Sequence, residues 1–202
     1  MSGTIVEFGL RLPETWHVLP GVGDAEWAGT MAAEIAAGSS EPVAVDLLRR
    51  QLLDVRASVD AMGDVGRLRT AVLVDDVTAP LVSAMMTVGL MTGADTDIYK
   101  AQMEQVAHEV EDAQLMGNQL FDAEVSAGQV IGAHFLIGHM QDGLGDAGAH
   151  LEERVHAAVF PTGTTDALDV MVVAANVGLF EDLPTTVVDL LENVTLRTEG
   201  VA

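Results

Sequence analysis

The strongest constraint in this sequence is that its strand-like segments follow one another with very short connections. FDAEV (121–125) is followed almost at once by QVIGAHFLIGHM (129–140), and only the turn PTGTTD separates LEERVHAAVF (151–160) from ALDVMVVAA (167–175). A parallel crossover needs a dozen or more residues, so segments this close together are expected to pair antiparallel. The sequence therefore predicts a mainly antiparallel sheet.

Helical periodicity marks other segments of the chain. Trp27, Met31 and Ile35 recur every four residues, and Tyr99 and Met103 do the same after a potential cap, at the Asp95 position. We expect helices over 24–37, 43–62 and 93–112, and a last helix with Pro184 in its first turn and Val194 on its buried face. The remaining strands are expected over 4–12, 15–19, 69–77 and 81–91.

The expected element order is thus β-β-α-α-β-β-α-β-β-β-β-α, with helices covering the apolar faces of the sheet. For 151–160 a helix through Leu151, Val155 and Val159 is an open alternative to the strand. No repeat, low-complexity tract or linker divides the chain, so we expect one domain, residues 1–202, of the α/β (α+β) class.

The charge balance limits the partners of such a domain. The chain has 31 acidic residues against 9 Lys and Arg, a formal net charge of −22. A surface of this sign repels phosphate backbones and anionic lipid, so we expect neither nucleic acid nor a membrane surface as partner. One interpretation is that the acidic residues only keep the protein in solution. The other is that they bind a protein partner, a basic one in particular.

Cysteine is absent, which removes disulfides, thiolate catalysis and cysteine-ligated zinc together. The first residues, MSGTIVEFGLRLPETW, show no basic stretch followed by a long apolar run, and no apolar stretch is long enough to span a bilayer. We expect a cytoplasmic location, with leaderless export as the alternative.

Residues 143–148, GLGDAG, match the glycine fingerprint of dinucleotide-binding folds at Gly143, Gly145 and Gly148. The fingerprint requires a parallel βαβ unit with an acid about twenty residues further on, for which Asp166 or Asp169 would serve. Acidic residues surround the glycines, however, and would repel a pyrophosphate. We therefore interpret the stretch as a hairpin loop in an antiparallel region and expect no cofactor there.

Two weaker candidate sites contain metal-ligating residue types. His139, Asp142, Asp146 and His150 lie close together in the 139–150 loop, where they could gather a divalent ion. Asp75 and Asp76 form a carboxylate pair at the end of a predicted strand and could serve acid–base or metal chemistry. For both sets the alternative is a solvated loop or turn. No spacing of the other histidines indicates a catalytic triad.

Two stretches resemble one family. VEFGLRLPETWHVLPG is similar to an opening strand, a Pro-x-x-Trp turn and a second strand, and VFPTGTTDALDVMVVAANVGLFEDLPTTVVDLLENVTL to a closing strand, an asparagine-containing loop and a terminal helix. Both features resemble Mog1/PsbP-like domains. This resemblance implies an α/β/α sandwich with a mainly antiparallel central sheet and a binding module without catalytic residues. The family includes a small-GTPase-binding factor, a photosystem subunit, lipoproteins and secretion-effector chaperones; this chain lacks the acylatable Cys of the lipoproteins.

These observations lead to three functional hypotheses. The first is a non-enzymatic protein-binding module, such as a cytoplasmic adaptor or secretion-associated chaperone, with no catalytic residue and no cofactor. The second is a small-ligand or metal-binding protein or enzyme that uses Asp75, Asp76 and the 139–150 loop. The third is a structural subunit of a homo-oligomer.

Overall fold

The structure, a computed structural model, describes residues 3–21, 26–38, 42–63, 67–76, 80–106, 113–140 and 149–200. The helices are α1 (Glu26–Ile35), extended by a 3₁₀ turn (Ala36–Gly38), α2 (Pro42–Ala61), α3 (Thr96–Val106) and α4 (Leu183–Leu191). The strands are β1 (Gly3–Leu10), β2 (Trp16–Val18), β3 (Arg67–Leu73), β4 (Ala84–Met91), β5 (Ala113–Val125), β6 (Gly128–Met140), β7 (Ala149–Phe160), β8 (Ala167–Ala174) and β9 (Val194–Gly200).

Seven strands form one antiparallel sheet in the order β2-β3-β4-β8-β7-β6-β5. The mainly antiparallel α+β fold predicted from the short connections is confirmed. The segment 151–160 belongs to strand β7, which excludes the helical alternative. β1 and β9 pair antiparallel in a separate two-stranded sheet.

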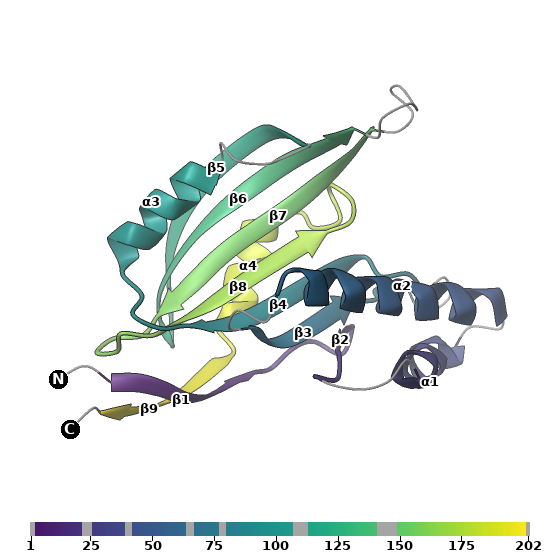
Figure 1. The fold of residues 1–202 in the computed structure, drawn as a ribbon, viewed down its shortest axis with the longest axis horizontal. Coiled ribbons are helices and arrows are strands. Elements are labelled where there is room, and N and C mark those ends of the chain that lie inside the picture. The colour runs from purple at the N-terminus through teal and green to yellow at the C-terminus, as the bar shows by residue number, and fades with distance from the viewer. Residues whose placement is uncertain are drawn as a thin grey trace.

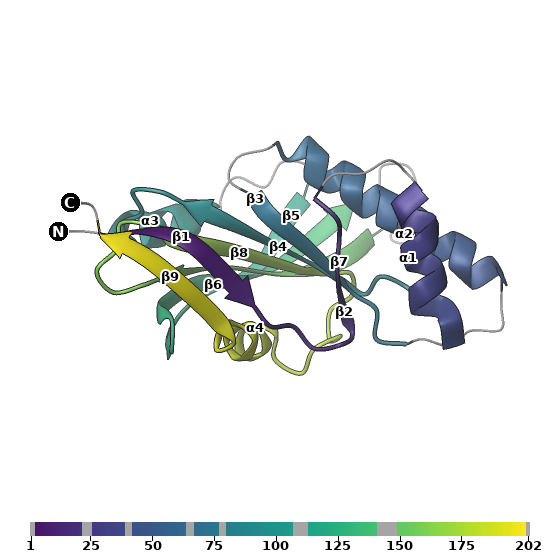
Figure 2. The same ribbon diagram turned by 90° about the horizontal axis from the view of Figure 1, so that it is seen from below.

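Helices cover both faces of the large sheet (Figures 1 and 2). Along β3 and the residue that follows it, the alternation of side chains sends Val72 and Val74 into a core shared with α1 and α2. Ala71 and Leu73 point the other way, into a larger core that also contains Leu183 and Val187 of α4. α3 packs through Tyr99 and Met103 against β6 and β7 in a third cluster.

The end of the chain differs from the prediction. α4 begins at a cap in which the Asp182 carboxylate accepts a hydrogen bond from the backbone N–H of Thr185 at 2.8 Å, and it ends at Leu191. Val194, expected on the buried face of this helix, instead opens β9 and is buried there. The predicted helix is therefore confirmed over Leu183–Leu191, but the expectation that it reaches Val194 and ends the chain is wrong: β9 takes up Val194 and runs antiparallel to β1.

The start of β5 also differs from the prediction. The strand begins at Ala113, eight residues before the predicted start at Phe121. In the first half of β5, apolar and polar residues alternate only weakly. Polar residues and Gly117 occupy both faces of this strand, which lies at the edge of the sheet. The predicted helix over 93–112 is α3 up to Val106, and its remainder falls on 107–112, outside the described residues.

Candidate functional site

The N-terminus of α4 and the strands β5, β6 and β7 enclose a pocket of about 520 Å³. We call it the acidic pocket, because its polar lining includes three carboxylates and one imidazole: Glu153, Glu181, Asp182 and His134. Phe121, Leu183 and Val188 supply the main apolar part of the lining. A concave site with an apolar body and a few convergent polar groups is the usual form of a binding site.

Glu153 is the most constrained carboxylate of the acidic pocket. Its residue is only 7% exposed, on a strand whose other buried positions are apolar. One carboxylate oxygen lies 2.9 Å from Nε2 of His134 on the neighbouring strand, and the other accepts from the backbone N–H of Gly178 at 3.4 Å. These contacts hold the carboxylate in place.

The pocket carries a net negative charge. Asp122 of β5 also borders the pocket, but its carboxylate is paired with Lys100 of α3, 3.1 Å from Nζ, on the opposite face of the sheet from α4. The three carboxylates on the α4 side, those of Glu153, Glu181 and Asp182, give the pocket a formal charge of −3 when His134 is neutral. Glu181 is exposed at the rim, where solvent and a partner can both reach it. The negative charge of the acidic pocket therefore favours the binding of a cationic group.

The outer edge of β5 borders this pocket. Among the described residues β5 pairs with β6 alone, so its other edge has no described strand beside it. Met116 is 60% exposed and Leu120 is 40% exposed. An edge strand with exposed apolar side chains is a template for the addition of another strand.

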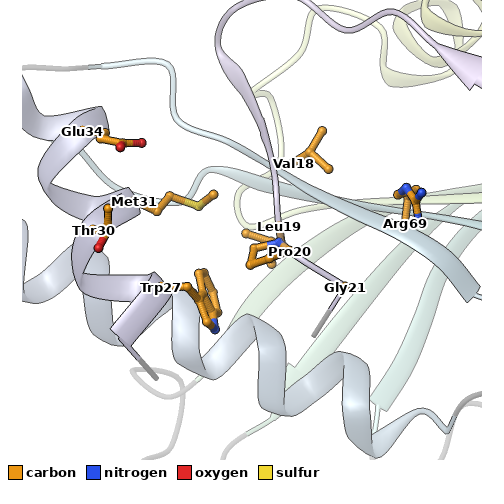
Figure 3. Close-up of a pocket in the computed structure, with 9 residues that line it drawn as sticks. All are labelled: Val18, Leu19, Pro20, Gly21, Trp27, Thr30, Met31, Glu34 and Arg69. Atoms are coloured by element: carbon orange, nitrogen blue, oxygen red, sulfur yellow. The ribbon is translucent and has the colours of Figure 1, made fainter. Parts of the chain in front are cut away.

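A second hollow, of about 560 Å³, lies at the other end of the molecule between α1 and the chain from Val18 to Gly21 (Figure 3). Trp27 and Met31 reach from α1 toward Leu19 and Pro20. Arg56 lies over the Trp27 ring, 5.6 Å from its centroid, and donates hydrogen bonds to the carbonyls of Pro20 and Gly21. The charged lining consists of Glu34 and Arg69, one of each sign, so the hollow has no net charge preference.

The histidines, which look scattered in sequence, meet carboxylates across neighbouring strands. Besides the His134–Glu153 contact, Nε2 of His156 lies 2.7 Å from a carboxylate oxygen of Asp169, and Nε2 of His139 lies 3.2 Å from Glu152. Sequence separation does not reveal these pairs, because they depend on the register between adjacent strands. The sequence signal that could have helped to find these pairs is the alternation of side chains along each strand, which puts each histidine on a definite face of the sheet.

Tyr99 lies above the His156–Asp169 pair. Its ring is edge-on to His156 and to Phe160, with centroids 6.0 and 5.6 Å away. Burial, and then the negative charge of Asp169, raise the pKa of the phenol far above its ordinary value. The carboxylate thus acts on the phenol electrostatically, but the buried hydroxyl meets hydrogen-bond geometry with no group in the described part of the chain. Tyr99 remains a neutral phenol.

Asp75 and Asp76 lie apart from the described ends of the 139–150 loop, His139 and His150. Both are exposed at the end of β3, and the Oγ of Ser83 donates a hydrogen bond to Asp75 at 2.6 Å. β4 and β8 lie between β3 and β7 in the sheet, so three strand spacings separate the two candidates, roughly 14 Å. Among the described residues, Asp75 and Asp76 therefore do not share a site with His139 or His150.

The strands on either side of the glycine fingerprint are the antiparallel neighbours β6 and β7, as a hairpin requires, and no helix follows. Of its associated acids, Asp166 is buried and accepts from the backbone N–H of Ile5 at 2.9 Å, while Asp169 bonds His156. The glycines themselves, with Asp142 and Asp146, fall on 141–148, outside the described residues.

His139 and His150 are brought together by the structure. They are direct cross-strand partners, and their rings stack with centroids 4.6 Å apart. Across the described ranges, no three His, Asp or Glu side chains already stand in an arrangement that would hold a metal ion.

In the same ranges, no helix is long and apolar enough to cross a membrane.

Comparison with known proteins places the chain in no family. No family model matches it, and no curated protein matches it. Among solved structures it is similar to LpqN, a protein involved in cell envelope biogenesis of Mycobacterium tuberculosis, with a TM-score of 0.43 and 12% sequence identity over 94% of this chain and 82% of that chain. The function is therefore argued from the site itself.

Proposed function

We propose that this protein is a non-enzymatic protein-binding module that holds a basic segment of its partner in the acidic pocket. The observation that carries the proposal is the pocket of about 520 Å³ with three carboxylates in its lining. The proposed class of protein is a cytoplasmic adaptor or a secretion-associated chaperone. A kinship with Mog1/PsbP-like domains, whose members bind other proteins, is part of the same proposal.

The charges and the apolar lining together favour a lysine or arginine side chain as the anchor. The hydrocarbon stem of such a residue can pack on the half-buried Phe121 and Val188 while its cationic head meets the carboxylates. Glu153, already fixed by His134 and Gly178, needs little reordering to accept a charge-assisted hydrogen bond. The net charge of −22 over the whole chain adds steering of a basic partner toward the surface.

The edge of β5 supports an extended partner segment. Gln119, Phe121 and Ala123 of β5 all contribute to the pocket lining. A partner strand added along this edge would direct every second side chain to the same face of the sheet, and so toward the pocket. Backbone pairing would then supply affinity, and the acidic pocket would select a basic side chain.

The first test is affinity purification of the tagged protein from its own cells, read by quantitative mass spectrometry, with three baits. The wild type is compared with Glu181→Lys, at the pocket rim, and with Glu34→Lys, an exposed acid in the hollow of Figure 3. We expect one dominant partner at near-equal stoichiometry, retained by Glu34→Lys and lost by Glu181→Lys. Both variants change the net charge equally, so total charge alone cannot produce this difference.

A second pair of variants tests the strand edge. Leu120→Lys places a charge on β5, and Val6→Lys places one on β1 at a residue of matching exposure, 40% against 41%. We expect only the first to weaken capture of the same partner. Equal capture by all variants, or a purified chain that only associates with itself as its concentration rises, would contradict the proposal.

A further inference from the structure

The far end of the β6–β7 hairpin carries a cluster of three side chains that the proposed function does not use. His139 on β6 and His150 on β7 are directly opposed in the antiparallel register, so both side chains point to the same face of the sheet. Glu152, two residues further along β7, also points to this face. We call these three residues the hairpin cluster.

Two of the three hold their ligand atoms at the separation that one ion requires, in a hydrogen bond that a bound ion would replace. A tetrahedral ion with ligand bonds of 2.0–2.1 Å holds any two of its ligand atoms about 3.3 Å apart. Nε2 of His139 and a carboxylate oxygen (Oε2) of Glu152 are 3.2 Å apart. The other oxygen of Glu152 accepts a hydrogen bond from Nε of Arg154 at 2.8 Å, which fixes the orientation of the carboxylate as outer partners of metal ligands do.

His150 is the residue that has to move. Its ring is nearly parallel to that of His139, at an interplanar angle of 11° and a centroid distance of 4.6 Å. The side chain is exposed, so rotation about its own bonds meets solvent instead of a packed core. A change of rotamer at this one residue would turn a pair of ligand atoms into a set of three.

We propose that the hairpin cluster binds a Zn²⁺-class transition-metal ion through His139, His150 and Glu152, with water in the remaining position. Two imidazoles and one carboxylate are a ligand set that suits zinc. Imidazole nitrogen favours Zn²⁺, Cu²⁺ and Ni²⁺, whereas Mg²⁺ and Ca²⁺ favour oxygen ligands alone. The chemistry of the cluster thus predicts selectivity as well as binding.

The test is a titration of the chelator-treated, full-length protein with zinc chloride, followed by isothermal calorimetry. We expect saturable binding of one Zn²⁺ at this cluster, and no comparable binding of Mg²⁺. His150→Ala and His139→Ala should each weaken that binding by at least about tenfold, because each removes one of three protein ligands. Leu151→Ala, a half-exposed neighbour whose side chain points to the opposite face of β7, is the matched control and should bind as the wild type.

The many surface carboxylates are the competing explanation for any zinc uptake. Zinc held by them would bind equally to the wild type and to His150→Ala, and that result would overturn the proposal. So would the absence of saturable zinc binding by the wild type. His150 is exposed, so its substitution should leave folding intact, and an unchanged far-UV circular dichroism spectrum checks this.

Discussion

At the scale of single residues, the structure pairs polar side chains that the sequence could not pair. Alternation places successive strand residues on opposite faces of a sheet, as Val72 and Leu73 of β3 show. It could not predict which residue of the next strand stands opposite. Glu153 and His134 therefore remained unrelated in the sequence although they form the centre of the acidic pocket. Register is a property of the folded sheet.

Tyr99 gives a sharp prediction at this scale. Its hydroxyl is buried without a hydrogen-bond partner among the described residues. Removing a buried polar atom that makes no hydrogen bond removes its desolvation cost as well, so Tyr99→Phe should leave the free energy of unfolding unchanged or raise it by up to about 1 kcal/mol. Tyr99→Ala should lower it by roughly 3–5 kcal/mol, because it empties the packed site under α3. Urea unfolding measures both, and a clear loss of stability in Tyr99→Phe would reveal a hidden hydrogen bond.

The pH dependence follows from the same residue. In the folded protein the pKa of Tyr99 is raised above its ordinary value of 10.0. The folded state therefore holds the phenolic proton more tightly than the unfolded state. The resulting contribution to stability is complete below pH 10 and is lost as the pH rises further. Thermal unfolding at increasing alkaline pH should show a steeper loss of stability for the wild type than for Tyr99→Phe.

At the scale of helices and strands, periodicity predicted most of the architecture. α1, α2 and the antiparallel block from β6 to β8 lie close to their predicted ranges, because each carries a strong apolar pattern. β9 was missed because the pattern of α4 continues to Val194, and the helix stop at Leu191 depends on packing against the sheet. The early half of β5 was missed because an edge strand need not alternate.

The cap of α4 allows stability and binding to be separated. Asp182 accepts the hydrogen bond from the Thr185 N–H and also contributes a carboxylate to the acidic pocket. Asp182→Ala should lower the free energy of unfolding by about 1 kcal/mol through loss of the cap. Asp182→Ser keeps a capping oxygen and should restore most of that stability, as urea unfolding would show. If the proposed function holds, neither variant recovers full affinity for a basic partner, because both lack the charge.

At the scale of the whole molecule, charge dominates the expected behaviour. A net charge of −22 on 202 residues makes the compact state repel itself, and salt screens that repulsion. Raising sodium chloride from low to physiological concentration should therefore raise the melting temperature. A stabilisation of about 1 kcal/mol corresponds to an increase of a few degrees. Differential scanning calorimetry measures this, and a melting temperature independent of salt would mean that carboxylate pairing already offsets the repulsion.

The two ends of the large sheet are unequal: β5 offers 13 residues at one end, and β2 offers three at the other. Strand addition at β5 occupies the long edge and leaves, at the other end of this sheet and among the described residues, only the three-residue edge of β2. Head-to-tail growth needs both edges, so a chain of such sheets stops after one pairing. The molecule can take on a single strand from a partner without acting as the seed of a fibre.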